Sequence, residues 1–351
     1  MRFLPIRSSG AKLFLLSLMH FAVDGLCAYL VFTKLYPNNP KNGIVVFLAY
    51  NILAFITQSP VGMLIDKYNR PKLFLFISML AMSLGYIFGS VWPIAVTCIG
   101  ISNSLFHVAG GKYLTDKSGN DIGQLGVFVS TGAIGLVLGQ RYTALNVLPY
   151  ILFALFIVCG LVVILSEDGE TLPYAERYED IKNESLALVA VLAVVFVRSF
   201  VGKVVTPDFI LEGHMFLVIS LATALGKAAG GIGAKVFGVK PTTYVSMVIA
   251  ALCLTIGASN PYTFVLGVFA FNFTMPITLY FANILLKGRE GFAFGTLAAS
   301  LVPGYLIAMY FAYSIPMRVC TAVLCLASML IIVTIYRKIK YDHCSTIDYN
   351  S

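Results

Sequence analysis

The chain alternates between long apolar runs and short polar segments over its whole length. Each apolar run holds about 20 residues, the length that an α-helix needs to cross the hydrocarbon core of a bilayer. Pro276 and Pro303 fall inside two of these runs and are expected to kink the helices there. The pattern predicts an all-α fold with twelve membrane-spanning helices, at about residues 11–33, 43–64, 72–90, 92–114, 122–142, 146–166, 185–205, 212–232, 241–258, 262–286, 291–313 and 316–336.

One polar segment is much longer than the others. It reads SEDGETLPYAERYEDIKNES, spans residues 166–185 and holds about half of the 16 acidic residues. Because it leaves six predicted helices on either side, it indicates two six-helix bundles built as repeated halves. We predict an N-terminal bundle at 1–166, a cytoplasmic polar linker at 167–184, and a C-terminal bundle with a short cytoplasmic tail at 185–351.

The composition also indicates a membrane protein. Of 351 residues, 59% are hydrophobic and only 11% are charged, and the mean hydropathy is +0.87. A soluble domain of this length needs more charge to cover its surface. The first apolar run is too long for a signal peptide, so we expect it to be retained as the first helix.

The formal net charge of +8 would by itself suggest a nucleic-acid ligand. With the N-terminus on the cytoplasmic side, however, most of the 24 Lys and Arg residues fall in cytoplasmic segments. This distribution follows the positive-inside rule, so the basic excess reflects topology. We expect a multi-pass protein of the cell membrane, of the bacterial cytoplasmic type, with both termini in the cytoplasm, the lipid bilayer as a partner and no nucleic-acid partner.

Two loops indicate an internal duplication. GMLIDKYNRPK lies between the second and third predicted helices, and GIGAKVFGVKP lies between the eighth and ninth. They align without a gap, at the same place in each half. Asn69 falls opposite Gly238, and both residue types tolerate the left-handed backbone that a tight loop needs. The aligned pairs are Gly62 with Gly231, Asp66 with Lys235, Asn69 with Gly238 and Pro71 with Lys240.

The first of these loops resembles the cytoplasmic loop signature of the major facilitator superfamily, G-x-L-a-D-r-x-G-r-k. It departs from that signature at Asn69 and Pro71. The resemblance implies twelve helices in two six-helix bundles, with the first, fourth, seventh and tenth helices lining a central cavity. It further implies a secondary transporter that works by alternating access. The residues that carry it are Gly62, Leu64, Asp66, Lys67, Arg70 and Lys72.

Three further stretches resemble particular members of that superfamily. HFAVD in the first predicted helix and SLFHVAGGKY in the fourth are similar to the fosmidomycin-resistance-like branch. GVFVSTGAIGLVLGQ in the fifth resembles the glycine-rich antiporter motif through Gly132, Gly135 and Gly139, although it lacks the proline usual there. These likenesses imply export of a solute in exchange for protons.

His20 and Asp24 lie four residues apart in the first predicted helix, so they share one face. Asp24 falls near the bilayer midplane, where a lipid-facing charge costs at least ~2.5–3.5 kcal/mol. We therefore expect the pair to face a wet cavity or a partner. Protonation of Asp24 would remove the cost, which makes Asp24 the leading candidate for proton coupling and His20 a modulator. The alternative is a structural polar contact between helices.

Asn103 and His107 repeat this spacing in the fourth predicted helix. The resemblance implies that the first and fourth helices border the same cavity, which would bring these two residues close to His20 and Asp24. We expect His107 to modulate proton coupling and Asn103 to bind substrate.

Polar residues also interrupt the seventh and tenth predicted helices. Arg198 stands in VFVRSFVGK, and Asn272 and Tyr280 stand in FNFTMPITLYFAN. Arginine keeps its proton in proteins, so Arg198 either binds an anionic substrate group or neutralises a carboxylate such as Asp24. The alternative for Arg198 is that it snorkels toward the outer surface. We predict that all three residues bind substrate.

Asp66 and Arg70, in the loop after the second predicted helix, are expected to act in gating. Asp66 can pair with Arg70 or meet the N-terminus of a helix from the other bundle, and either contact would hold one state of a transport cycle. The alternative is an exposed salt bridge worth under about 1 kcal/mol. Lys235 takes the place of Asp66 in the second half, with the opposite charge, and is also expected to act in gating.

No nucleotide-binding loop, metal-ligand spacing or nucleophile motif is found in the sequence. We expect no cofactor, no metal site and no enzymatic activity. The leading hypothesis is a monomeric secondary transporter that exports a small-molecule substrate in exchange for protons. Proton-coupled import is the second hypothesis, and a transporter-like sensor or assembly protein is the third. The polar groups would admit anions, zwitterions and drugs alike, so they do not identify the substrate.

Overall fold

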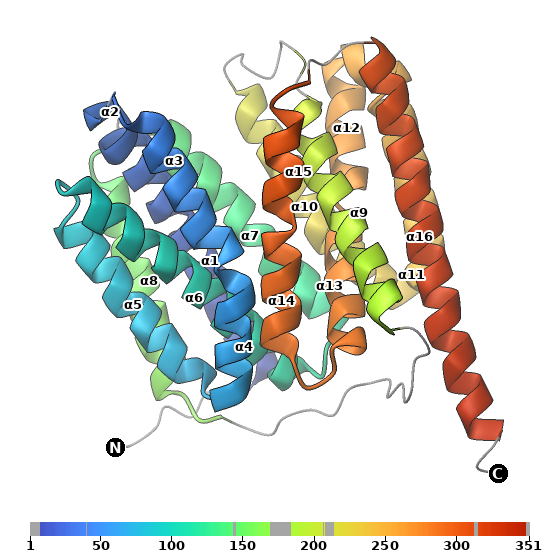
Figure 1. The fold of residues 1–351 in the computed structure, drawn as a ribbon, viewed down its shortest axis with the longest axis horizontal. Coiled ribbons are helices and arrows are strands. Elements are labelled where there is room, and N and C mark those ends of the chain that lie inside the picture. The colour runs from blue at the N-terminus through green and yellow to red at the C-terminus, as the bar shows by residue number, and fades with distance from the viewer. Residues whose placement is uncertain are drawn as a thin grey trace. The chain divides into compact units, whose positions relative to one another are not determined.

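The computed structural model describes residues 8–39, 41–142, 145–168, 184–205, 207, 214–311 and 315–348, with side chains up to residue 340, and most of them are helical (Figure 1). Two compact units divide the chain. The predicted halves, 1–166 and 185–351, differ from these units by two short exchanged segments. Unit 1 comprises Met1–Gly119, Val127–Leu172 and Gly288–Ala299, and unit 2 comprises Asn120–Gly126, Pro173–Lys287 and Ser300–Ser351.

Unit 1 holds most of the helices of the N-terminal half together with one from the C-terminal half. Two of its helical stretches contain a π-helical turn, η1 and η2. The elements are α1 (Ser9–Tyr29), η1 (Leu30–Leu35), α2 (Tyr36–Asn38), α3 (Gly43–Asn51), η2 (Ile52–Ile56), α4 (Gln58–Tyr68), α5 (Pro71–Ile87), α6 (Trp92–Ser118), α7 (Ile122–Arg141, from Val127 onward), α8 (Leu148–Leu165) and α14 (Glu290–Ala299).

Unit 2 holds the remaining helices and the first turn of α7. Its buried apolar side chains come mainly from α9, α11, α12 and α16 and include Val201, Met247, Phe264 and Cys325. The elements are α9 (Glu184–Val204), α10 (Met215–Phe237), α11 (Val239–Cys253), η4 (Ile256–Ser259), α12 (Pro261–Phe271), α13 (Thr274–Leu285), α15 (Leu301–Ala308) and α16 (Ile315–Asp348).

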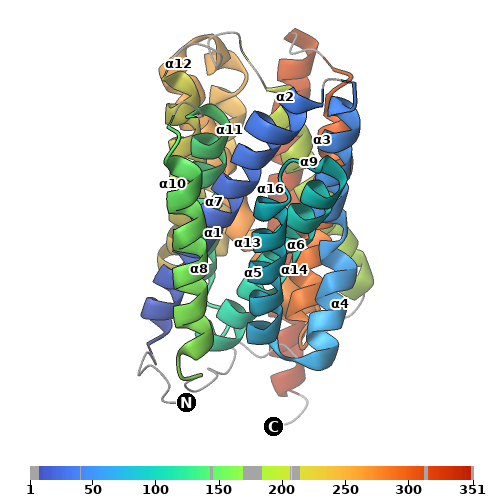
Figure 2. The same cartoon turned by 90° about the vertical axis from the view of Figure 1, so that its left-hand side faces the viewer.

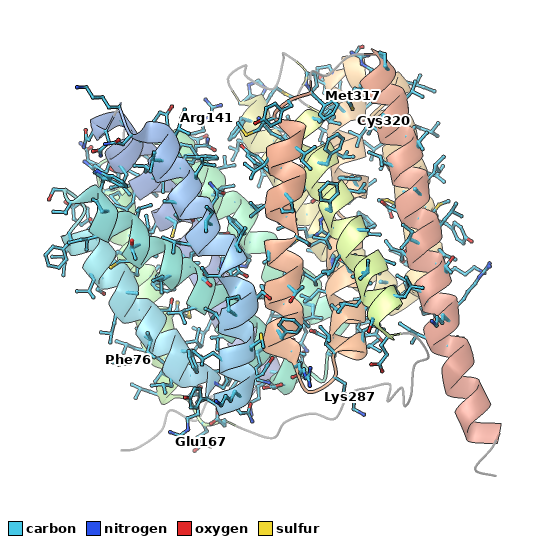
Figure 3. The ribbon with its side chains drawn as sticks, viewed as in Figure 1. Phe76, Arg141, Glu167, Lys287, Met317 and Cys320 are labelled. Atoms are coloured by element: carbon cyan, nitrogen blue, oxygen red, sulfur yellow. The ribbon has the colours of Figure 1, made fainter. Side chains whose placement is uncertain are left out.

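The twelve predicted spans all correspond to helices in the described part of the chain. Ten helical stretches are long and apolar enough to cross a membrane, and two shorter apolar helices, α5 and α11, account for the other two. Many apolar side chains point outward, as Phe76 does in Figure 3, as expected for helices that face lipid. Arg141 and Glu167, also labelled there, lie at opposite ends of unit 1.

The backbone of the two aligned loops confirms the expectation drawn from their sequences. Asn69 ends α4 in the left-handed region, with φ 49° and ψ 43°. Gly238, between α10 and α11, also has a positive φ, of 91°. Both positions therefore need a residue that tolerates positive φ.

The predicted kinks occur as breaks that separate α12 from α13 and α14 from α15. Proline has no N–H for the carbonyl four residues earlier, and its ring crowds that carbonyl. Pro276 lies four residues after Asn272, the residue that follows α12, and Pro303 follows Ser300 by three residues. The second break coincides with a unit boundary, because α14 belongs to unit 1 and α15 to unit 2.

Helices α1, α5, α6 and α8 run alongside one another in unit 1 (Figure 2). Helix α7 packs closely on α1 because glycines face it. A Cβ atom at Gly135 would strike the carbonyl of Phe21, and one at Gly139 would strike the carbonyl of Gly25. The small residues therefore let the two backbones approach, as is common between membrane helices.

Candidate functional site

Four of the predicted site residues form one polar cluster inside unit 1. His20 and Asp24 project from α1, and Asn103 and His107 project from α6, which packs on α1. His20, Asn103 and His107 are buried, whereas the Asp24 side chain keeps 20% of its surface exposed. The Asp24 carboxylate is therefore the most accessible of the four side chains.

The Asp24 carboxylate is the centre of the cluster. Asn103 donates a hydrogen bond from Nδ2 to Asp24 Oδ1, at 3.1 Å. His20 Nε2 lies 3.3 Å from Asp24 Oδ2, and His107 Nε2 lies 3.5 Å from Asp24 Oδ1. The amide oxygen of Asn103 is buried and has no hydrogen-bond partner among the described residues, so it remains an acceptor beside the carboxylate.

Backbone carbonyls set the protonation of both imidazole rings. His20 Nδ1 lies 2.7 Å from the carbonyl oxygen of Phe128, and His107 Nδ1 lies 2.8 Å from that of Asn103. A carbonyl oxygen only accepts hydrogen bonds, so both Nδ1 atoms must carry a proton. In a neutral ring, Nε2 is then an acceptor with a lone pair.

The two Nε2 atoms face each other and cannot both be bare. They lie 3.0 Å apart, a hydrogen-bond distance, with the Asp24 carboxylate beside them. If His20 and His107 were both neutral, two lone pairs and a carboxylate would meet with no proton between them. The geometry therefore needs at least one further cation among Nε2, Nε2 and the carboxylate.

A proton is the smallest cation that meets this need, and a metal ion would also fit the atoms. The ligand-type atoms of His20, Asp24 and His107 lie within 4.8 Å of one another. Histidine and carboxylate are common ligands of first-row transition metals, and a metal-bound imidazole often donates its other N–H to a carbonyl. The sequence spacing predicted no metal-ligand cluster, because His107 is 83 residues from Asp24 along the chain.

Helix α7 contributes two features that the sequence did not single out for this site. One is the Phe128 carbonyl that receives the His20 hydrogen bond. The other is Gly132, where a Cβ atom would collide with Asp24 Oδ2 and His20 Nε2. Gly132 was named from the sequence only for the likeness of its stretch to the antiporter motif, and the spacing of the glycines was the one signal that α7 lies close to α1.

Each predicted site residue of unit 2 has a hydrogen bond of its own. Arg198, on α9, donates from Nη1 to Thr278 Oγ1 on α13, at 3.3 Å. Asn272 donates to the Val268 carbonyl of its own helix, and the Tyr280 carbonyl accepts from Asn120. Thr278 was not predicted, since a threonine in an apolar helix gives no distinctive signal.

The Asp66 carboxylate caps the start of α14. It accepts the backbone N–H groups of Gly291, at 2.9 Å, and Phe292, at 2.8 Å. Helix N-termini attract negative charge, so this contact is favourable. Figure 1 shows α14, in orange, beside α4, in blue. The contact is the second of the two expected for Asp66, whereas Arg70 is exposed and forms no ion pair within the described ranges.

Lys112 joins Asp66 to two further carboxylates. Its Nζ lies 3.1 Å from Glu290, 3.5 Å from Asp116 and 3.6 Å from Asp66. Lys112, Glu290 and Asp66 each expose less than a tenth of the side chain. One ammonium group thus serves three carboxylates in a mostly buried position, a network that the sequence did not reveal.

Lys235 has its own carboxylate partner within unit 2. Its Nζ lies 2.5 Å from Asp121 Oδ2. The other Asp121 oxygen accepts the backbone N–H of Gln124, so Asp121 caps the start of α7. Lys235 is therefore paired as Asp66 is, but it is a cation, whereas Asp66 at the matching position is an anion.

Lys72, one of the residues that carry the superfamily resemblance, holds the end of α8. Its Nζ donates to the Ser166 carbonyl at 2.7 Å and pairs with Asp168 at 2.8 Å. Partial burial raises the pKa of Asp168, but the hydrogen bond and charge of Lys72 outweigh it and lower the pKa overall. Cations near the last carbonyls of a helix are favourable.

No known protein-family profile matches the sequence, and no curated protein matches it. Solved structures do match. The chain is similar to the E. coli fucose:proton symporter FucP, with a TM-score of 0.66 and 12% identity over 96% of this chain and 99% of that chain. It is also similar to a bacterial homologue of the iron transporter ferroportin, with a TM-score of 0.61 and 11% identity over 95% and 99% of the two chains.

A third similar structure is the human organic anion transporter MFSD10, with a TM-score of 0.60 and 12% identity over 93% of this chain and 99% of that chain. The fucose symporter is itself a major facilitator superfamily transporter. At these identities the likeness concerns the fold. The chain is an all-α, multi-pass membrane protein with the fold of major facilitator superfamily transporters.

Proposed function

We propose that the protein is a secondary transporter that moves a small organic solute across the membrane by alternating access, coupled to protons at Asp24, His20 and His107. One observation carries the proposal. Both Nδ1 atoms donate to carbonyls, and the two Nε2 atoms meet 3.0 Å apart beside a carboxylate. A cation shared among these atoms would satisfy the arrangement, and a proton that can leave would couple the charge of Asp24 to a change of state.

The fold supports the same proposal. The similar structures are transporters, and one of them is a fucose:proton symporter. Asp24 is open on one side, which gives a proton or a solute access to the carboxylate. The free acceptor oxygen of Asn103 offers a place for a solute hydroxyl or amine. Transport requires no bond to be made or broken, so no enzymatic role is proposed.

Export in exchange for protons is the first candidate for the direction. It follows from the glycine-rich stretch of α7 and from the stretches in α1 and α6 that resemble the fosmidomycin-resistance-like branch. Import by proton symport is the second candidate, favoured by the likeness to the fucose:proton symporter. A sensor or assembly protein on a transporter scaffold is the third. The proposal places the protein as a monomer in a bacterial cytoplasmic membrane, with both termini in the cytoplasm.

Asp66 and Lys235 are proposed as gate residues. Each is linked to the N-terminus of a helix, Asp66 directly at α14 and Lys235 through Asp121 at α7. Breaking such a contact during the transport cycle would release a helix end. Arg70, an exposed cation in the loop after α4, is proposed as a third gate residue.

The test uses purified protein in liposomes that contain a trapped pH-sensitive dye. A panel of solutes is offered under an imposed solute gradient, with wild type, Asp24→Asn and the control Asp168→Asn. Asp168 is a matched carboxylate that lies in a surface ion pair. We expect solute-dependent proton flux in wild type and in the control, and none in Asp24→Asn.

Two results would contradict the proposal. Flux that persists in Asp24→Asn would place proton coupling elsewhere, and no flux with any solute would favour a sensor without transport. A third arm adds a chelator or a divalent metal. Flux that requires the metal and disappears with the chelator would show that the cluster carries a metal ion instead of a proton.

A further inference from the structure

Arg198 is a cation inside a membrane helix without a charged partner in the described part of its own unit. It lies on α9, fourteen residues after Glu184, the first residue of that helix. An arginine within a membrane span is costly and normally faces a cavity or pairs with another group. Here its hydrogen bond goes to the neutral hydroxyl of Thr278.

The sequence explains why no carboxylate compensates Arg198 from neighbouring helices. The chain has no Asp or Glu at 185–207, at 213–289 or at 291–341. Glu184 is about 21 Å away along the helix, at 1.5 Å per residue. Glu290 lies in unit 1, where it pairs with Lys112. Asp121, at the start of α7, pairs with Lys235. The stretches of unit 2 that these ranges cover therefore offer Arg198 no anion.

The alternative partner named from the sequence, Asp24, is already engaged within its own cluster. Asn103 donates to its carboxylate, and the Nε2 atoms of His20 and His107 lie beside it. A guanidinium group presents five N–H donors in a planar fork that matches a carboxylate or a phosphate. The donors of Arg198 that Thr278 does not engage are therefore suited to an anion from outside the protein.

Thr278 holds the guanidinium in place. Its hydroxyl donates to the Met275 carbonyl at 2.8 Å, which turns an oxygen lone pair toward Arg198. Thr278 is itself buried, at 1% exposure, so this geometry is fixed by packing. Thr278 is thus a positioning residue for Arg198.

We infer that the transported solute carries a carboxylate or a phosphate group and that Arg198, positioned by Thr278, binds this group. The inference rests on the proposed transport function and specifies its substrate class. The two other cations near the outer end of unit 2 are engaged differently. Lys203 lies over the ring of Tyr305, 5.6 Å from its centroid, and Arg318 donates to Ser259 on an exposed surface.

The experiment measures the thermal stability of the purified protein against pairs of anionic and neutral solutes at matched ionic strength. The pairs are gluconate and glucitol, galacturonate and galactose, and glycerol 3-phosphate and glycerol. We expect at least one anion, and not its neutral partner, to raise the unfolding temperature of wild type. In Arg198→Gln, the apparent affinity for that anion should fall ~10-fold or more.

Four further variants separate the positioning role of Thr278 from general damage to the protein. Arg318→Gln, which removes a cation elsewhere in unit 2, should leave the affinity unchanged. Thr278→Val should weaken the affinity for the anion about 3- to 10-fold. Thr278→Ser, which keeps the hydroxyl, should bind the anion about as well as wild type does. Arg198→Lys keeps the charge without the planar fork of donors. Its affinity for the anion should lie between those of wild type and Arg198→Gln.

The inference is wrong if no anion stabilises wild type, if neutral partners stabilise it equally, or if Arg198→Gln binds the anion as well as wild type does. The outcomes also distinguish it from the proposed function. Proton flux with a neutral solute, lost in Asp24→Asn, would keep proton-coupled transport and reject the anion site. Anion binding lost in Arg198→Gln, without proton flux, would keep the anion site and reject proton coupling.

Discussion

Two matching regions can be compared: the end of α4 in unit 1 and the end of α10 in unit 2. Both pack closely against the start of another helix, but the charged residues at the matching position have opposite signs. In each, a glycine brings the helix against the start of another helix. A Cβ atom at Gly62 would strike the backbone of Gly291 on α14, and one at Gly231 would strike Ile122 and Gly126 on α7. In each, a carboxylate caps that helix start, but Asp66 reaches it from the last turns of α4, whereas Asp121 precedes its own helix.

The lysine that pairs with the capping carboxylate also differs in position between the two regions. In unit 1 it is Lys112, buried among three carboxylates, and in unit 2 it is Lys235, whose side chain is 57% exposed. Ion pairs lose most of their value when water screens them, and a buried charge is costly once it loses its partner. Similar backbone packing can therefore carry ion pairs of very different strength. We expect the buried contact of Lys112 in unit 1 to contribute far more to stability than the exposed contact of Lys235 in unit 2.

Lys112→Met should give the largest effect, because it leaves three carboxylates without their ammonium group in a mostly buried place. We expect a loss of ~3–5 kcal/mol in the stability of unit 1. The measurement is the thermal unfolding midpoint of the purified protein in detergent. An unchanged midpoint would mean that these carboxylates are protonated or solvated, and the contrast between the two loops would fail.

Gly62→Ala and Gly231→Ala should have similar, intermediate effects, because in both cases a methyl group meets backbone that cannot turn away. Each should cost about 1–3 kcal/mol. Gly202→Ala, on α9, is the control, since a Cβ atom there meets no atom within 4 Å. If only one of the two loop variants is destabilised in thermal unfolding, the shared backbone packing is wrong.

Lys235→Met should have a small effect of under ~1 kcal/mol, because its ion pair with Asp121 is exposed. The midpoint should respond to added salt less in this variant than in wild type. A loss as large as that of Lys112→Met would show that exposure does not decide the value of these two contacts.

Asp168→Asn should have the smallest effect on stability, because it removes an exposed ion pair within unit 1. The pKa of Asp168 is lowered by Lys72 despite partial burial, so the ion pair contributes stability above the unfolded-state pKa of about 3.9 and loses it as pH falls through the folded-state pKa. The Asp168 side chain is 63% exposed, so the contribution is small. Wild type should be slightly more stable than the variant at pH 7, with the difference vanishing in acid; a difference that grows in acid would reverse the sign of the argument.

The sequence predicted what depends on periodicity and local backbone. Apolar runs located the helical stretches, ten of them long enough to span a membrane. The spacing of His20 with Asp24 and of Asn103 with His107 identified the faces that meet, and the loop alignment predicted the positive φ of Asn69 and Gly238. These features follow from neighbours within one helix or one turn.

The remaining features depend on residues far apart in the chain. The Phe128 carbonyl that sets the His20 tautomer is backbone, and Thr278 is an ordinary residue in an apolar helix. Lys112 meets Glu290 only because α14 packs with α4 and α6. Neither composition nor spacing contains this information, because it arises from the packing of helices.

The central claim is that a proton sits among His20, His107 and Asp24. The most direct test is histidine-selective ¹⁵N NMR of the metal-free protein at neutral pH. The chain has only 4 histidines, so variants of His20 and His107 assign the signals. The account predicts a protonated Nδ1 on both rings and a proton on Nε2 shared within the cluster. A bare Nδ1 on either ring, or two bare Nε2 atoms, would contradict it.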